Sequence, residues 1–211
     1  MPAAKTPTFT VRHLQLARAL FAAMAAVMIT FTSDHSAAIG LAAFSGFAVA
    51  SGLVWGLSAW LIYPAGRRAV PVLLALVNGA AGIIASSPMN RTTTMFFVIV
   101  ITWAAITTIV EGWWALYERR GAHAAEAKDS LGVAIITAVL LLAIALIQPT
   151  FALEYFNETI NEGGTLTGIT IAVGVFGGYA AIIAVYLGIA GFSPKNDVVA
   201  PDTATTQEVS S

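Results

Sequence analysis

Six stretches of this sequence are long and apolar enough to cross a bilayer, and polar, turn-rich segments separate them. A spanning helix needs roughly 20 mostly apolar residues, because the hydrocarbon core is about 30 Å thick and a helix rises about 1.5 Å per residue. The stretches cover residues 14–31, 37–62, 70–86, 95–116, 131–147 and 168–190. The sequence therefore predicts an all-α polytopic membrane protein with six transmembrane helices.

Composition agrees with a bilayer as the solvent. Of the 211 residues, 58% are hydrophobic and only 10% are charged, whereas a soluble domain carries about 25% charged residues. The net charge of −1 argues against a nucleic-acid partner, since binding phosphates requires a concentrated basic face. The chain has no cysteine and only three scattered histidines, which excludes thiolate chemistry and leads us to expect no metal and no cofactor.

The basic residues predict the orientation of the helices. With six spans, nine of the ten Lys and Arg residues fall on the side of the two termini, and only Arg91 falls on the other. Because Lys and Arg concentrate in cytoplasmic loops, we expect both termini in the cytoplasm and the protein in the plasma membrane. We expect residues 1–13 to form a cytoplasmic N-terminal segment, residues 14–192 the transmembrane domain and residues 193–211 a disordered cytoplasmic tail. Residues 14–31 are long enough to span, which favours an uncleaved first helix over a signal peptide.

The helices are expected to form three hairpins with similar ends. The second helix ends in Trp60 and Tyr63 before Arg67 and Arg68, and the fourth ends in Trp114 and Tyr117 before Arg119 and Arg120. These ends indicate an internal repeat, or independent anchors at the membrane interface.

Together with the helix end at residues 111–120, this hairpin pattern resembles the HdeD-type short-repeat bacterial membrane proteins. The resemblance covers roughly residues 14–192. It implies a six-span fold and an envelope or acid-stress role, and it carries over no catalytic residue.

Glu111 is the carboxylate expected deepest in the membrane. It lies eight residues before Arg119, about 12 Å along a helix, where a charge is costly unless it faces protein or water. Asn78 lies at a similar depth on the preceding helix and Arg18 lies near the inner end of the first, so either could hold Glu111. A polar link between helices is the favoured interpretation, and a proton- or cation-sensing site is the alternative.

Small residues recur at spacings that let helices approach closely. These positions include Gly52 and Gly56 on the second helix, Gly79 on the third, and Gly174 and Gly178 on the sixth. Packing within the chain is the favoured interpretation, and formation of a homo-oligomer is the alternative.

The segment before the sixth helix contains Glu154, Glu158 and Glu162 and no Lys or Arg. Leu153, Phe156 and Ile160 follow helical spacing, so residues 151–162 are expected to form a short amphipathic helix at the outer interface. Protonation of its carboxylates would let this helix sink deeper into the membrane at low pH.

These features favour a small integral membrane protein without catalytic activity, whose partners are the lipid bilayer and a homo-oligomer or larger membrane complex. The first hypothesis is an HdeD-like envelope or acid-stress protein, and the alternative is an accessory subunit of a respiratory or envelope assembly. A transporter or channel is disfavoured, because the sequence offers one intramembrane acid and no helix pair broken by Gly or Pro at mid-membrane.

Overall fold

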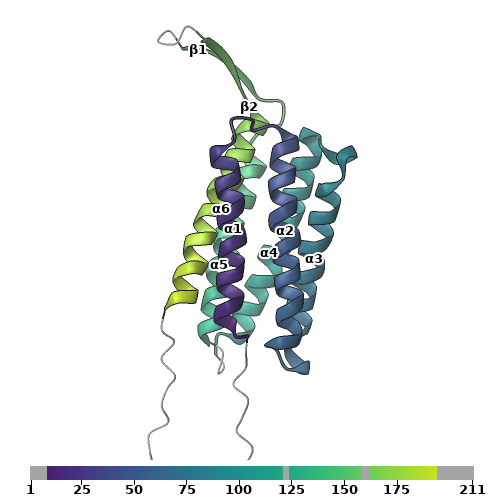
Figure 1. Cartoon of the computed structure of the whole chain (residues 1–211), viewed down its shortest axis with the longest axis vertical. Helices are drawn as coiled ribbons and strands as arrows, with labels where there is room; N and C mark the ends of the chain where they lie inside the picture. Colours follow the sequence, from purple (N-terminus) through teal and green to yellow (C-terminus); the bar gives the residue numbers. More distant parts are fainter. Residues whose placement is uncertain (1–8, 121–123, 158–161, 194–211) are drawn as a thin grey trace, which may run out of the picture.

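Six helices dominate the computed structural model, which describes residues 9–120, 124–157 and 162–193. The elements are α1 (Val11–Phe31), α2 (Ala37–Leu61), η1 (Ala65–Arg67), α3 (Ala69–Ser86), η2 (Pro88–Asn90), α4 (Thr93–Glu118), α5 (Ala124–Leu146), β1 (Ala152–Asn157), β2 (Glu162–Thr167) and α6 (Gly168–Phe192) (Figure 1). Over this described part of the chain, all six α-helices are long and apolar enough to cross a membrane. The predicted all-α, six-span membrane fold is confirmed.

Two helices begin at least three residues before their apolar stretches. α1 begins at Val11, where the backbone N–H of Thr10 donates to His13 Nδ1 at 3.2 Å. α5 begins by Ala124 and runs through the polar stretch Glu126–Asp129 before its apolar part. The length of an apolar stretch matches the thickness of the hydrocarbon layer. The helical hydrogen bonds continue beyond that layer into the interface, so these helices are longer than their apolar stretches. The expected C-terminal tail falls almost entirely outside the described residues.

The helices form a closed ring in sequence order. Each helix contacts its neighbours in the chain, and α6 packs against α1 to close the ring. The most extensive contacts join α1 to α6, α2 to α3 and α4 to α5, whereas the helices of each expected hairpin, α1–α2, α3–α4 and α5–α6, contact each other less. The three hairpins are therefore held together mainly by contacts between them.

An aromatic cluster joins alternate helices at the centre of this ring. Phe44 and Phe47 of α2, Trp103 of α4, and Phe176 and Tyr179 of α6 pack with ring centroids 5.2 to 6.4 Å apart, mostly edge to face. Offset and edge-to-face contacts are the favourable geometries for aromatic pairs. α2, α4 and α6 therefore share one buried core.

The same three helices begin with similar caps, all at the end of the bundle that carries β1 and β2. Ser36, Thr92 and Thr167 each accept a hydrogen bond from the backbone N–H three residues later, at 3.5, 3.3 and 3.3 Å. Such caps satisfy an otherwise unpaired N–H in the first helical turn. The second helix of each hairpin therefore begins with the same kind of cap.

Gly52 makes the closest helix contact among the predicted packing glycines. A Cβ at Gly52 would lie 2.9 Å from Gly79 N and 3.0 Å from Ala75 O, so the backbones of α2 and α3 touch here. At Gly56 the nearest atom would be the Ala75 Cβ at 3.7 Å, which is ordinary contact. Gly52 therefore packs within the chain, whereas a Cβ at Gly79 itself would meet nothing within 4 Å among the described residues.

Gly174 and Gly178 do not pack within the chain. A Cβ at either would meet nothing within 4 Å among the described residues, and both are exposed. Gly177 is the residue that packs, with Ile29 Cγ2 lying 2.7 Å from where its Cβ would be. Adjacent positions point about 100° apart around a helix, so the glycine spacing alone could not distinguish the buried face from the exposed one.

The prediction of an amphipathic helix at residues 151–162 is wrong. The described residues there form an antiparallel hairpin, in which Leu153 pairs with Leu166 and Tyr155 with Gly164. Aromatic and β-branched residues such as Tyr155, Phe156 and Thr165 favour strands. The helical spacing of Leu153 and Phe156 was coincidental. Ile160 and Glu158 lie outside the described residues, as does the side chain of Glu162.

Candidate functional site

Glu111 and Arg18 form an ion pair across the inside of the ring. Arg18 Nη2 of α1 donates to Glu111 Oε1 of α4 at 2.8 Å. Glu111 is only 1% exposed, and α1 and α4 are opposite each other in the order of the ring. Of the two expected partners of Glu111, Arg18 makes the contact.

Further polar contacts surround Arg18. Its guanidinium lies over the ring of Trp55 of α2, 4.6 Å from the centroid, a geometry that favours the cation. One helical turn before Arg18, Gln15 Nε2 donates to Asp129 Oδ2 of α5. α1 is therefore tied by polar side chains to α2, α4 and α5 near the end of the bundle where α1 begins and α6 ends, which we call the terminal end.

Asn78 links α3 to α4 through a different residue, Trp103. Its amide Nδ2 donates to Leu74 O at 2.8 Å within α3, and its Oδ1 accepts from Trp103 Nε1 of α4 at 3.1 Å. The expected bond from Asn78 to Glu111 is absent from the described hydrogen bonds. A similar depth in the membrane is a necessary condition for such a bond, but the direction of each side chain around its helix decides the partner.

The polar layer around the ion pair is tightly packed. A cavity of about 20 Å³ is lined by Gln15, Arg18, Tyr63, Asp129 and neighbouring residues, which is room for about one water molecule. Gln15 Oε1 and Glu111 Oε2 are buried and have no hydrogen-bond partner within the described part of the chain. A single ordered water could serve such an oxygen.

Arg67 forms a second linkage at the terminal end. Its guanidinium lies 3.2 Å from Glu118 at the end of α4 and 3.7 Å from Glu126 at the start of α5. It also lies over the rings of Tyr63 and Trp114, 5.7 and 5.9 Å from their centroids. Burial, reinforced by the charge of Glu126, raises the pKa of Tyr63 well above its usual range.

The aromatic residues at the helix ends divide into two kinds. Tyr63 and Trp114 are buried and pack edge to face, with centroids 5.4 Å apart, so they belong to a small core and are not interface anchors. Trp60, Trp113 and Tyr117 are instead exposed, as expected for anchors in the headgroup region.

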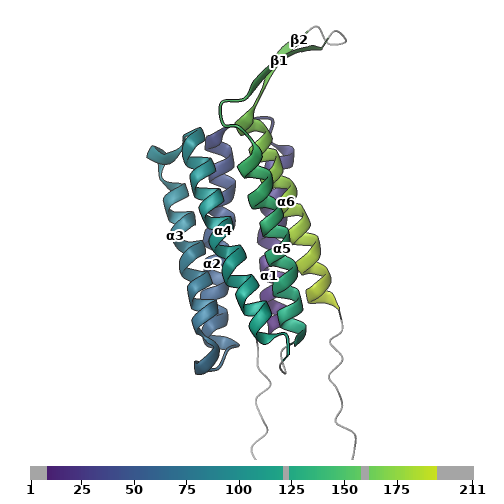
Figure 2. The same ribbon diagram turned by 180° about the vertical axis from the view of Figure 1, so that it is seen from behind.

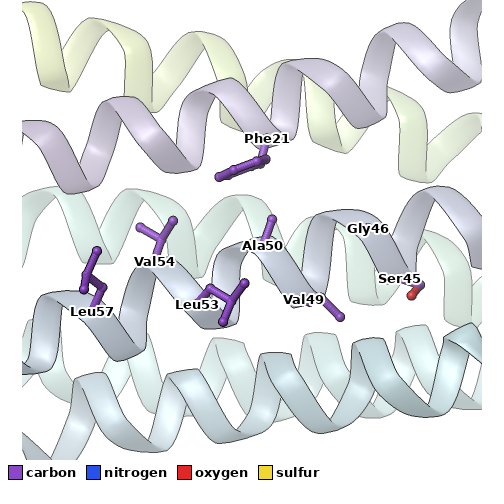
Figure 3. A pocket seen from close by; sticks show the side chains of 8 residues that line it. All are labelled: Phe21, Ser45, Gly46, Val49, Ala50, Leu53, Val54 and Leu57. Atoms are coloured by element: carbon purple, nitrogen blue, oxygen red, sulfur yellow. The ribbon is translucent and has the colours of Figure 1, made fainter.

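The larger hollows are apolar and open to the side of the bundle. One of about 510 Å³ lies between α1 and α2 (Figure 3). It is lined by Phe21 of α1 and by seven residues of α2, namely Ser45, Gly46, Val49, Ala50, Leu53, Val54 and Leu57. Another of about 530 Å³ lies between α3 and α4, within residues 76–106. Both occur where the two helices of a hairpin contact each other less. Their apolar lining is suited to lipid chains.

The β1–β2 hairpin is the other candidate site. It extends beyond the ends of the helices, away from the bundle, in both views (Figures 1 and 2). Leu153, Tyr155 and Phe156 are more than half exposed on it. An isolated two-stranded hairpin is marginally stable in water, so its own side chains must hold it together.

Aromatic rings covering glycines provide that stability. A Cβ at Gly164 would lie 2.7 Å from the ring of Tyr155, its cross-strand partner. A Cβ at Gly163 would lie 3.5 Å from the ring of Phe156, its own partner. Cross-strand packing of an aromatic ring over a glycine stabilises a strand pair. The sequence signal that could have revealed this hairpin is the Gly-Gly pair opposite two aromatic residues.

No family model, curated protein or solved structure matches this chain. Within the described residues, no three His, Asp or Glu side chains are placed to hold a metal ion. The function of the protein is therefore inferred from its own residues.

Proposed function

We propose that this integral membrane protein is a non-catalytic accessory subunit, which binds a partner protein through its β1–β2 hairpin. The observation that carries this proposal is the position of Leu153, Tyr155 and Phe156, which are exposed on a hairpin beyond the helix bundle. Apolar side chains on the helices are expected to face lipid, whereas the hairpin extends beyond the helices, where we expect such side chains to face water. Exposed apolar surface in water is characteristic of interaction sites.

The interior of the bundle supports a structural role. Its buried charges are used in contacts between helices, as in the pair Arg18–Glu111, and the cavity beside Arg18 is small. Each described spanning helix is continuous, whereas transporter sites commonly use broken helices at mid-membrane. These features favour an accessory subunit over a transporter or channel.

The distribution of Lys and Arg supports an orientation with both termini in the cytoplasm and the hairpin on the outer face of the plasma membrane. An envelope or acid-stress setting, which the HdeD-type resemblance implies, is compatible with this orientation. A helix that sinks into the membrane on acidification is not part of the proposal, because the segment is a hairpin.

The experiment is purification of the protein from its native membrane in mild detergent. We compare the full chain with a variant in which residues 152–167 are replaced by a Gly-Ser linker of equal length. A variant with Gly174→Ala and Gly178→Ala, which adds methyl groups to open space on α6, is the matched control. We expect a stoichiometric partner with the full chain and the control and its loss with the linker variant.

A photo-crosslinker attached at Ala152→Cys, on the exposed start of β1 and the sole cysteine of that variant, should join the hairpin to the same partner. Recovery of the partner at equal yield with the linker variant, or isolation of all three proteins without a partner, would exclude the proposed function.

A further inference from the structure

Both strands of the hairpin have an open edge. A two-stranded sheet leaves the outer N–H and C=O groups of each strand unpaired, which makes them a template for another strand. Natural edges are commonly protected by proline, lysine or a covering helix. β1 (ALEYFN) and β2 (EGGTLT) contain no Pro and no Lys, and the hairpin extends away from the helices (Figures 1 and 2).

The register shows which groups face the edge of β1. Gly168 N–H donates to Phe151 O at 2.8 Å, and the pairing of Ala152 with Thr167 continues to the pair Phe151–Gly168. Groups that face the partner strand alternate with groups that face outward along an antiparallel strand. The backbone groups of Ala152, Glu154 and Phe156 therefore face the open edge of β1.

The side chains give β1 two different faces. Leu153 and Tyr155 lie on one face with Leu166, the partner of Leu153, and make it apolar. Glu154 and Phe156 lie on the other face, because successive side chains alternate across a strand. A strand added beside β1 would meet apolar side chains on one face and a carboxylate with an aromatic ring on the other.

The charge around the hairpin favours a basic occupant. The loop from Ile147 to Thr167 contains three Glu and no Lys, Arg or His. Glu154, Tyr155 and Phe156 line a hollow of about 450 Å³ together with Gly163, Gly164 and Thr165. Carboxylates and aromatic rings both attract cations, and the stem of Lys or Arg packs on apolar surface.

We propose that the partner binds by adding an extended segment to the open edge of β1, and that this segment alternates apolar and basic residues. Its apolar side chains contact Leu153 and Tyr155, and its Lys or Arg side chains contact Glu154 and Phe156. This proposal rests on the proposed function and specifies the chemistry of the partner. A second copy of the hairpin does not fit, since it brings the same carboxylates and no cation.

The first test uses the full chain in detergent and synthetic peptides as probes. The binding probe is a seven-residue peptide that alternates lysine and valine. One control alternates glutamate and valine, and the other is the lysine–valine peptide with N-methyl groups on alternate backbone amides. We expect the lysine–valine peptide to bind, and both controls to bind at least about tenfold more weakly because each lacks the charge or the main-chain donors.

Substitutions in the hairpin separate charge from main-chain pairing. Glu154→Gln removes only the charge and should weaken binding roughly two- to fivefold, as for one cross-strand charge pair. Glu154→Pro also removes an outward N–H and should weaken binding at least about tenfold. Gly174→Ala, which adds a methyl group to open space on α6 away from the hairpin, is the control and should bind as the unchanged chain does.

Equal binding of the N-methylated peptide, or unchanged binding by Glu154→Pro, would overturn strand addition. Equal binding of the glutamate–valine peptide would overturn the basic partner. A polarity-sensitive dye at Tyr155→Cys should report water in phosphatidylcholine vesicles without peptide, and a report of hydrocarbon would show that lipid covers this face and also overturn the proposal. Failure of the peptides alongside hairpin-dependent purification of a partner would leave the proposed function intact.

Discussion

The ion pair Arg18–Glu111 provides the most direct test of how the bundle is held together. Glu111→Leu removes the carboxylate that Arg18 Nη2 contacts at 2.8 Å and leaves a guanidinium inside the ring. Glu111→Gln keeps an oxygen that can accept the same hydrogen bond. Arg18→Met with Glu111→Leu removes both charges.

The expected magnitudes follow from burial. The side chains of Arg18 and Glu111 are 13% and 2% exposed, and removing one partner of a buried pair costs about 3–5 kcal/mol. Arg18 retains its contact with Trp55 and has a long stem that can move toward the terminal end, so we expect about 3 kcal/mol for Glu111→Leu. Glu111→Gln exchanges a charged hydrogen bond for a neutral one, which costs about 1 kcal/mol.

The double substitution is the matched control. Replacing both members of a buried pair by apolar residues is often neutral or stabilising, so Arg18→Met with Glu111→Leu should have a free energy of unfolding within about 1 kcal/mol of the unchanged chain. The assay is unfolding of the purified protein in mixed micelles of increasing denaturing detergent, followed by tryptophan fluorescence.

The reasoning would be refuted by either of two results. If Glu111→Leu is as stable as the unchanged chain, the pair does not hold α1 to α4. If the double variant loses as much stability as the sum of its two single variants, the two side chains act independently and are not coupled as a pair.

Further predictions concern packing, pH and orientation. Gly52→Ala should lower the free energy of unfolding by about 1–3 kcal/mol in the same assay, because its Cβ would lie 2.9 Å from the backbone of α3 and overpacking is costly, whereas Gly174→Ala, which faces open space, should raise it by about 0.5–1 kcal/mol. Burial raises the pKa of Tyr63, so its stabilising contribution is complete below the unfolded value of about 10 and is lost as pH rises beyond it. Tyr63→Phe should therefore show a smaller fall in thermal midpoint above about pH 10 than the unchanged chain. A membrane-impermeant maleimide should label Tyr155→Cys but not Arg119→Cys in intact cells, and labelling with the opposite preference would reverse the orientation.

The number and approximate positions of the helices follow from local sequence. A run of apolar residues must match the thickness of the bilayer, and backbone groups in lipid must be hydrogen-bonded within the segment, so hydropathy is sufficient to locate the spans. The distance of Glu111 from the end of its helix was predictable in the same way, because it depends only on position along one helix.

The partners of those residues depend on the three-dimensional packing. Position along the helices alone made Arg18 and Asn78 equally possible partners of Glu111. The rotation of each helix brings Arg18 to Glu111 and turns Asn78 toward Trp103. Rotation likewise buried Gly177 and exposed Gly174. Neighbouring positions point about 100° apart on any helix, and the rotation of the helix about its own axis decides which of them is buried. That rotation is set by contacts across the whole ring, which no single stretch of sequence contains.

Both local sequence and contacts between the two strands determine the structure of residues 152–157 and 162–167. Leu153 and Phe156 fit both a helical stripe and the two faces of a strand, so their spacing alone allows either structure. The pairing of Tyr155 with Gly164 and of Phe156 with Gly163 provides contacts that a helix could not make. Sequence by itself thus determined how many times the chain crosses the membrane, whereas tertiary contacts decided which side chains meet, because each such contact joins residues that are distant in the chain.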